Sequence, residues 1–264
     1  MTMEQAMMHI QQFSFALEGK SILENLSFTL AQGEYLAVIG PNGAGKSTFL
    51  KCLMRVHEHG TSQGAIRLKG RLLSEYDQRS LAALISYVPQ AGGWIPPFTV
   101  EELLRLSRYP YLAAGGALRK ADLEAVEQAL RLTGMEALAS RRLASLSGGE
   151  RQKAFVAAAL AQETEIILLD EPASFLDPKH TAALNRLIRM LHRERGITML
   201  TVTHDLNHPL CMEGKILVLR QGRQLFFGQA QEVLHNAVLE EAFGHQFTCF
   251  QHPETGRPTL LAKE

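Results

Sequence analysis

Residues 40–47 read GPNGAGKS and place glycines ahead of a lysine and a serine. In such a loop the glycines let backbone N–H groups close around phosphate oxygens, the lysine neutralises the β and γ phosphates, and the serine hydroxyl can ligate Mg²⁺. An apolar run at residues 35–39 precedes the loop and a helix-like segment at 46–54 follows it, which is the context this motif requires. The pattern predicts a polyphosphate site made by Gly40, Pro41, Asn42, Gly43, Ala44, Gly45, Lys46, Ser47 and Thr48.

Two adjacent carboxylates, Asp170 and Glu171, end another continuous apolar run at residues 166–169. Ligands of parallel α/β sheets bind outside the carboxyl ends of the strands, where Asp170 can hold Mg²⁺, usually through water. Glu171 can orient and deprotonate an attacking water. Such a pair is also common at solvated strand ends, and the phosphate loop upstream is what favours the catalytic interpretation.

A third segment, LSGGE at residues 146–150, opens an alanine-rich stretch predicted to be helical to about residue 162. Ser147, Gly148 and Gly149 would present a hydroxyl, backbone N–H groups and the positive end of a helix to an anion. A simple helix cap has a similar sequence. A cap does not require two glycines before the glutamate, however, so the segment favours a ligand contact.

The elements that position these residues alternate between strand and helix. The apolar run at 166–169 and a β-branched run at 198–203, which ends in His204, both predict buried parallel strands. Between them, apolar residues at helical spacing from 184 to 191 and a stop at Gly196 predict a crossover helix. A hairpin is predicted around Gln221 and Gly222, and a turn at residues 253–256.

The middle of the chain is predicted to be helical, because residues 99–145 contain no strand signal. Thr99 and Glu102 form a capping-box pattern that opens one helix, and apolar residues spaced from 123 to 130 mark another that ends near Gly134. We therefore expect a helical lobe inserted between two halves of a parallel-sheet core, with a flexible connection at residues 113–116.

Composition narrows the class of protein. The 264 residues contain 27 Lys and Arg and 27 Asp and Glu, so no basic field predicts a nucleic-acid partner. The three cysteines have no metal or disulfide spacing, which fits a reducing compartment. Residues 57–59 read HEH, which is typical of a solvated turn, so no metal besides Mg²⁺ is expected. Neither a signal peptide nor a membrane span is predicted, so any membrane role is expected to be peripheral.

Taken together, these motifs resemble those of the ATP-binding-cassette (ABC) ATPases. The segment LSGGE followed by Arg151 and Gln152 is similar to the signature motif that separates this family from other P-loop proteins, and Gln90 in YVPQ, the loop SFLD at 174–177 and His204 follow the family's order. The resemblance covers nearly the whole chain. It implies an α/β fold with a mostly parallel P-loop core (1–88 and 162–235), an N-terminal antiparallel β subdomain, an inserted helical subdomain (89–161) and a C-terminal tail (236–264).

The resemblance also implies residue roles in ATP hydrolysis, with ATP and Mg²⁺ bound. Glu171, His204 and Gln90 would be catalytic: Gln90 contacts Mg²⁺ and the water, and His204 contacts the γ-phosphate. The metal ligands would be Ser47, Gln90 and Asp170. The family further implies a head-to-tail homodimer in which Ser147 and Gly149 of one copy complete the site built on Lys46 of the other.

One position departs from the family pattern. ABC ATPases usually place an aromatic residue ahead of the second strand to stack on adenine, and Leu17 occupies that place here. Phe15 lies two residues away. Either Phe15 stacks on the base instead or the base is held by apolar contact alone.

The family resemblance favours the energy subunit of a membrane transporter, at the cytoplasmic face of the inner membrane, with integral permease subunits as partners and a substrate-binding protein as an indirect one. Segments 97–103 (PFTVEEL), 107–111 (SRYPY), 204–207 (HDLN) and 254–258 (ETGRP) are similar to importers of metal chelates of the iron–siderophore, haem or cobalamin type. Zinc, manganese and molybdate importers stay open. The alternative is a soluble ABC ATPase, such as one of iron–sulfur cluster assembly.

The loop at residues 91–98 is the predicted contact with the permease. It contains Trp94, Ile95 and Phe98 between glycines and prolines, and it directly follows Gln90. Such a loop either tucks into the helical lobe or forms an apolar docking surface for a cytoplasmic helix of the permease.

Overall fold

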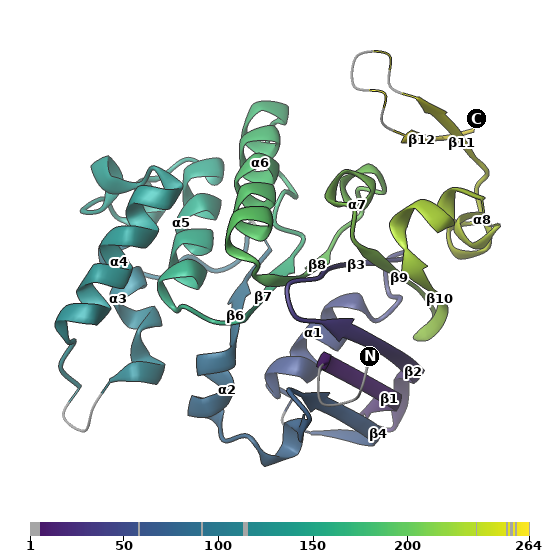
Figure 1. Ribbon diagram of the computed structural model, residues 1–264, viewed down its shortest axis with the longest axis horizontal. Coiled ribbons are helices and arrows are strands. Elements are labelled where there is room, and N and C mark those ends of the chain that lie inside the picture. Colours follow the sequence, from purple (N-terminus) through teal and green to yellow (C-terminus); the bar gives the residue numbers. More distant parts are fainter. Residues whose placement is uncertain are drawn as a thin grey trace. The chain divides into compact units, whose positions relative to one another are not determined.

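The computed structural model describes residues 6–57, 59–90, 92–112, 116–235, 237–251, 253, 256 and 258–263. The chain divides into two compact units, Met1–Glu75 with Thr198–Glu264, and Tyr76–Ile197. The predicted connection at 113–116 and the predicted turn at 253–256 lie largely outside the described residues. Figure 1 labels helices and strands of both units where there is room.

The first unit is built on a mixed sheet in the order β5-β4-β1-β2-β10-β9-β3-β8. Strands β1, β2, β4 and β5 pair antiparallel and form the N-terminal β subdomain. Strand β3 pairs parallel with both β8 and β9. The strands are β1 (Ala6–Leu17), β2 (Lys20–Ala31), β3 (Tyr35–Ile39), β4 (Gly60–Leu68), β5 (Arg71–Leu72), β8 (Thr198–Val202), β9 (Lys215–Arg220) and β10 (Arg223–Gln229).

Burial explains the sequence of the parallel strands. Every residue of β3 and of β8 is buried, so these strands are continuous apolar or β-branched runs with no alternation. The predicted hairpin is confirmed: β9 and β10 pair antiparallel around Gln221 and Gly222, both at positive φ. Helices of this unit are α1 (Lys46–Met54), α7 (Asn207–Met212) and α8 (Val238–Phe243), with 3-10 turns η2 (Leu73–Glu75) and η6 (Ala230–His235).

A second, two-stranded sheet of β11 (Phe247–Gln251) and β12 (Pro258–Ala262) ends this unit and was not predicted. Its strands carry mostly exposed side chains, so they lack the apolar pattern by which strands are found in sequence. Asn207 of α7 attaches β12, because its side chain accepts from the Leu260 N–H at 2.7 Å and donates to the Leu260 carbonyl at 3.2 Å.

The second unit combines two parallel strands with a group of helices. Strand β6 (Ile85–Val88) pairs with β7 (Ile166–Asp170), and α6 (Pro178–Arg195) follows β7. The other helices are α2 (Gln78–Leu84), α3 (Val100–Ser107), α4 (Lys120–Thr133) and α5 (Gly148–Ala161), with 3-10 turns η3 (Tyr109–Tyr111), η4 (Glu136–Leu138) and η5 (Leu143–Ser145).

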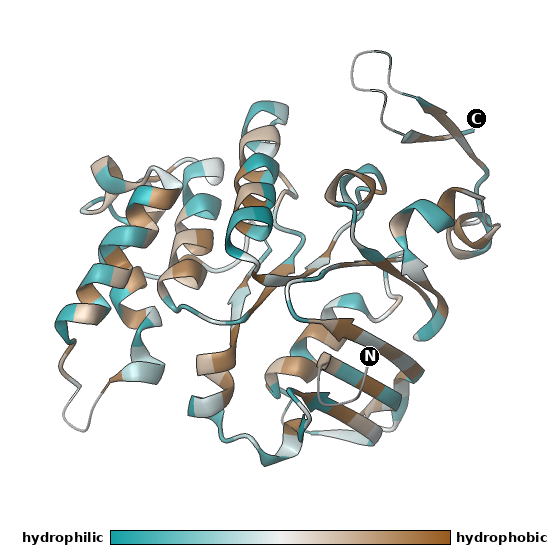
Figure 2. Ribbon diagram, viewed as in Figure 1, coloured by the Kyte–Doolittle hydropathy of each residue, from teal (hydrophilic) through white to brown (hydrophobic). Residues whose placement is uncertain are grey.

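Helices α3, α4 and α5 share one hydrophobic core that includes Val100, Leu104, Val126, Leu130 and Ala157. Figure 2 shows hydrophobic residues alternating with hydrophilic ones along α4, as expected for a helix with one buried face. The predicted helix ends are confirmed, because Thr99 and Glu102 form the capping box of α3 and Gly134 and Gly196 end α4 and α6 in the left-handed conformation.

No helix in the described part of the chain is both long and apolar enough to cross a membrane.

Candidate functional site

The phosphate loop connects β3 to α1, as predicted, and its glycines are required by backbone geometry. Gly40, Gly43 and Gly45 have φ of 150°, 78° and 97°. A Cβ on Gly40 would lie 2.1 Å from the Leu219 carbonyl oxygen of β9, so only glycine fits there. The loop can therefore turn sharply at the carboxyl end of a buried strand and present its N–H groups at the start of α1.

Lys46, the first residue of α1, folds its side chain back into this loop. Its ammonium donates to the carbonyl oxygens of Gly40 at 2.8 Å and Pro41 at 3.0 Å, and only 6% of the residue is exposed. The positive charge is thus held inside the curve of the loop, the position from which a lysine neutralises phosphate oxygens. Ser47 and Thr48 occupy the next positions of the same helix.

His204 lies at the same edge of the sheet as the phosphate loop. Because Val202 of β8 pairs with Val38 of β3, the chains leave the sheet side by side, with Gly40 and His204 each two residues beyond that pair. The His204 side chain is exposed. This register brings together two of the site residues predicted from sequence, although 164 positions separate them in the chain (204 − 40).

Asp170 is the last residue of β7 and is only 6% exposed. The hydroxyl of Tyr87 in β6 donates to its Oδ2 atom at 3.1 Å. Burial and the Asp170 carboxylate raise the pKa of Tyr87, so the phenol stays protonated and can donate. Sequence reasoning missed Tyr87, because a half-buried tyrosine in a short strand carries no sign of its partner.

Glu171 and Gln90 meet at the edge where β6 and β7 end. Val88 pairs with Leu169, so both residues lie two positions beyond the same pair. The Gln90 amide donates to Glu171 Oε2 at 2.7 Å, and the Ser174 hydroxyl donates to the same oxygen at 3.0 Å. Glu171 also has a φ of 46°, a conformation that non-glycine residues rarely adopt and that is often found at functional sites.

Ser147 caps α5, which begins at Gly148 as predicted. Glu150 accepts hydrogen bonds from the N–H and the hydroxyl of Ser147 at 2.9 and 2.8 Å, and the Glu150 N–H donates back to the hydroxyl oxygen. These contacts lower the pKa of Glu150. The segment is therefore a capping box, and it also leaves Ser147 and Gly148 exposed at the positive end of a helix.

The two glycines of this segment have different structural reasons. A Cβ on Gly149 would lie 2.3 Å from the His180 ring of α6, so packing within the chain requires glycine there. A Cβ on Gly148 would meet only Leu176, at an ordinary 3.7 Å. Among the residues that the structure describes, none therefore requires glycine at position 148, and a ligand contact there stays a prediction.

Gln152 links α5 to the segment that carries Gln90. The side chain is 1% exposed, and its amide donates to the Pro89 carbonyl oxygen at 2.9 Å. The sequence identified Gln152 only as a residue beside the LSGGE segment. Its hydrogen bond could not be predicted, because its partner lies 63 positions away.

Phe15, the residue predicted to stack on adenine, is 6% exposed. Its ring lies against His57, with 4.7 Å between ring centroids, and Gly60 provides the space that the ring fills. Stacking needs an open ring face. The predicted contact with adenine therefore requires Phe15 to turn away from His57, and the role stays a prediction.

Comparisons with known proteins show the family to which the chain belongs. The family model described as "ABC transporter" matches residues 23–174. The ferric enterobactin transport ATP-binding protein FepC of Escherichia coli is 34% identical over 99% of this chain and 96% of its own length. The hemin import ATP-binding protein HmuV of Streptomyces coelicolor is 36% identical, over 91% and 84%.

Solved structures give the same result. The inward-facing conformation of a metal-chelate type ABC transporter matches with a TM-score of 0.84 and 27% identity over 98% of both chains. A dimeric ATP-binding cassette in a post-hydrolysis state, bound to ADP and Pi, matches with a TM-score of 0.72 and 27% identity, over 85% of this chain and 99% of that one. This chain belongs to the ABC transporter family, as an ATP-binding protein that hydrolyses ATP to power transport.

Proposed function

We propose that this chain energises an importer of metal chelates, of the iron–siderophore or haem type, from the cytoplasmic face of the inner membrane. The observation that carries the proposal is the full-length similarity to proteins named for the transport of ferric enterobactin, iron(3+)-hydroxamate and hemin. The similarity to a metal-chelate type transporter supports it. The substrate-binding protein that delivers the chelate would meet the permease and not this chain.

In this proposal, backbone N–H groups of the phosphate loop and Lys46 hold the β and γ phosphates of ATP. Ser47, Gln90 and Asp170 supply hydroxyl, amide and carboxylate oxygens, the hard donors that suit Mg²⁺. The buried Asp170 carboxylate, held by Tyr87, fits such a ligand because its orientation is fixed. The bound ion would neutralise charge on the phosphate oxygens.

Glu171 is proposed as the general base that takes the proton from the attacking water. Its Oε2 atom accepts from Gln90 and Ser174. The second oxygen, Oε1, is the one proposed to face the water. Gln90 would orient the same water, and the exposed His204 imidazole would donate to the γ-phosphate.

A homodimer is proposed, because Ser147 and Gly148 are exposed at the start of α5 and because a similar ATP-binding cassette has been solved as a dimer. Ser147, Gly148 and Gly149 of one copy would complete the site built on Lys46 of the other. The test mixes a Ser147→Arg chain with a Glu171→Gln chain, each with its own tag, and isolates mixed dimers by two affinity steps. Shared sites place both changes in one site and leave the other intact.

The matched control is the mixed dimer of wild type with Glu171→Gln, which also keeps one intact site. Equal ATPase activity in the two mixed dimers, above that of either variant alone, supports shared sites. If the Ser147→Arg mixture is inactive while the control dimer is active, the sites are not shared.

A permease contact is proposed at a pocket of about 370 Å³ beside α3, lined by Phe98, Leu106, Tyr109, Leu112 and Leu118. Leu106 and Tyr109 are 51% and 65% exposed, and Trp94 is 78% exposed. Phe98 and Ile95 of the predicted loop pack in part against the core of α3, α4 and α5, whereas the exposed Trp94 presents most of its surface to a partner. An apolar segment of the permease would fill this pocket.

The test purifies the tagged chain from its native membranes, comparing wild type with Trp94→Ala/Tyr109→Ala. Leu123→Ala, an exposed apolar residue of α4, is the control. We expect wild type and control to retain a stoichiometric permease, and the double variant to lose it while keeping its ATPase activity. The reconstituted complex is then assayed for uptake of ferric enterobactin, a ferric hydroxamate and hemin.

Uptake of none of these chelates by an active complex contradicts the proposed cargo. Recovery of soluble iron–sulfur assembly proteins in place of a permease supports the alternative, a soluble ABC ATPase.

A further inference from the structure

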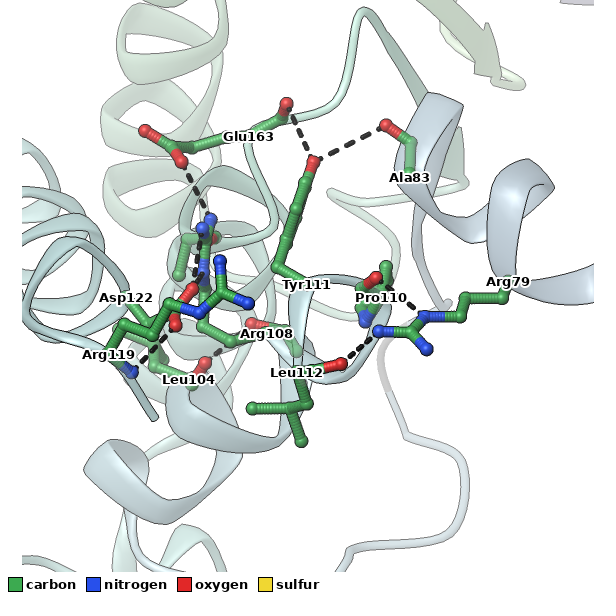
Figure 3. A network of polar contacts seen from close by, with 12 residues as sticks. Arg79, Ala83, Leu104, Arg108, Pro110, Tyr111, Leu112, Arg119, Asp122 and Glu163 are labelled. Atoms are coloured by element: carbon green, nitrogen blue, oxygen red, sulfur yellow. Dashed lines mark hydrogen bonds and ion pairs between the residues drawn. The ribbon is translucent and has the colours of Figure 1, made fainter. Parts of the chain in front are cut away.

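Arg108, the residue after α3, is 4% exposed and joins two other helices (Figure 3). Its Nε and Nη2 atoms contact Asp122 Oδ1, in the first turn of α4, at 3.0 and 2.9 Å. Its Nη1 atom donates to the Ala161 carbonyl oxygen and to Glu163 Oε2, both at 2.7 Å. One guanidinium therefore ties the start of α4 to the C-terminal end of α5.

Tyr111 extends the network to α2. Its ring faces the Arg108 guanidinium, with 4.2 Å between the guanidinium carbon and the ring centroid. Its hydroxyl lies 3.4 Å from the Ala83 carbonyl oxygen and 3.3 Å from that of Glu163. Arg79 of α2 donates to the carbonyl oxygens of Pro110 and Leu112, so the backbone of this turn is held from a second side.

Residues 106–112, which include Arg108 and Tyr111, also form part of the wall of the apolar pocket beside α3. Leu106, Tyr109 and Leu112 line the pocket, whereas Arg108 and Tyr111, which alternate with them in the chain, face the network. The residues that hold the end of α5 and the residues that line the pocket are therefore direct neighbours in the chain.

Stability alone does not account for a buried arginine. Apolar residues of similar volume often stabilise a core as well as a buried ion pair does, because the charges must lose their water. What the guanidinium adds is a fixed geometry between three elements, since its planar fork binds Asp122, Ala161 and Glu163 in set directions.

We propose that Arg108 is a positioning residue that couples α5 to the pocket. Helix α5 is capped by Ser147, where ATP of the partner copy is expected, and ends at Ala161, which Arg108 holds. A movement of α5 on ATP binding would then reach the pocket through Arg108 and Tyr111, a coupling between two sites carried by one rigid helix. The inference rests on the proposed function, both for the role of the pocket and for the ATP of the partner copy at Ser147.

The coupling is tested on the full chain by amide hydrogen exchange, with and without adenylyl-imidodiphosphate and Mg²⁺. In wild type, we expect the nucleotide to change exchange both at residues 148–152, at the start of α5, and at residues 106–112, at the pocket. In Arg108→Lys, which keeps a charge beside Asp122 but loses the fork, the first change remains and the second is lost.

Tyr111→Phe is the milder variant, since it removes only the hydroxyl, and it should weaken the second change. Arg131→Lys, in an exposed pair with Glu127, is the matched control and should behave as wild type. The proposal is overturned if Arg108→Lys and Tyr111→Phe both keep the change at 106–112, or if wild type shows none there while it responds at 148–152.

In the reconstituted transporter, Arg108→Lys should keep the KM for ATP and the basal turnover of the isolated chain, and lose about tenfold in transport per ATP hydrolysed. Tyr111→Phe should lose less, and Arg131→Lys should transport as wild type does. Failure of the proposed function has a different result, since wild type itself would then bind no permease or move no chelate. If wild type transports the chelate and Arg108→Lys transports as much per ATP hydrolysed, the positioning role of Arg108 is contradicted while the proposed function stands.

Discussion

Gln90 and Glu171 are joined by a hydrogen bond of 2.7 Å, although 81 positions separate them in the chain. Pro89, next to Gln90, accepts a hydrogen bond from Gln152 of α5. Two consecutive contacts therefore connect Glu171, the proposed general base, to the loop after β6 and this loop to helix α5, which Ser147 caps. A change in the position of α5 can reach Glu171 along this route.

Glu171→Gln should bind ATP as wild type does and hydrolyse it at least about 100-fold more slowly, because the amide keeps its size but cannot accept a proton. The amide oxygen can still accept from Gln90, so the loop should keep its structure. Single-turnover ATP hydrolysis and equilibrium nucleotide binding test this. Glu194→Gln, on the exposed face of α6, is the control, and near-wild-type hydrolysis in Glu171→Gln would remove the residue from the mechanism.

Lys46→Ala should weaken ATP binding itself, because it removes the ammonium held inside the phosphate loop. Lys51→Ala, an exposed change on the same helix, should bind normally. Nucleotide titration followed by calorimetry measures both. Equal affinity in the two variants would contradict the assignment of the loop.

Gln152→Leu should lower both stability and activity. The substitution keeps the volume but leaves the Pro89 carbonyl without its donor, which costs about 1–3 kcal/mol for a buried group. We expect kcat to fall more than the KM for ATP rises, because the contact positions Gln90 and Glu171 and does not touch the nucleotide. Urea unfolding and steady-state kinetics separate the two effects. A stability loss with unchanged kcat would show that the contact is only structural.

The fold was predictable where local pattern and burial agree. Strand β3, the glycine loop and α1 were predicted with their observed bounds, because the apolar run, the required glycines and the helical segment each have a local cause. The crossover helix α6 ends at Gly196, as predicted, because this glycine adopts the left-handed conformation. The parallel register of β3 with β8 then places His204 at the same edge of the sheet as the phosphate loop. From the sequence, this proximity was implied only by the resemblance to the family.

The unpredicted features depend on partners far away in the chain. Tyr87 contacts Asp170, Gln152 contacts Pro89 and Arg108 contacts Ala161, and none of these pairs leaves a periodic pattern in the sequence. The second glycine of the LSGGE segment is another example, because its reason is the His180 ring of α6. From the sequence, a cap and a ligand site were alternatives for this segment, whereas the structure shows a capping box with an exposed serine.

The two glycines give a matched pair of variants. Gly149→Ala should destabilise the protein by about 1–3 kcal/mol, since its Cβ would overlap the His180 ring. Gly148→Ala should leave stability unchanged or slightly higher, because alanine is the better helix former, and should still lose most ATPase activity if a phosphate approaches there. Thermal unfolding and ATPase assays on both variants test this. Full activity in Gly148→Ala would leave no functional reason for that glycine.

The Arg108 network contains a carboxyl group, Asp122, whose charge depends on pH. The Arg119 N–H, followed by the Arg108 guanidinium, lowers the pKa of Asp122, while burial opposes the shift. A carboxyl whose pKa is lowered in the folded state stabilises the protein at any pH above its pKa in the unfolded state, which is about 4. This contribution is lost as the pH falls from that value through the lower pKa of the folded state. The contribution should therefore be complete at pH 7 and decline only below about pH 4.

Asp122→Asn keeps the shape but removes the charge, so at pH 7 it should cost about 3 kcal/mol by leaving Arg108 without its buried partner. The difference from wild type should shrink as the pH falls below about 4, because protonation then removes the same charge from wild type. Urea unfolding of both proteins between pH 7 and pH 3 measures this difference. Glu127→Gln, which breaks an exposed pair with Arg131, should differ from wild type by less than about 0.5 kcal/mol throughout. A difference for Asp122→Asn that stays constant down to pH 3 would mean that the ion pair with Arg108 does not contribute through its charge.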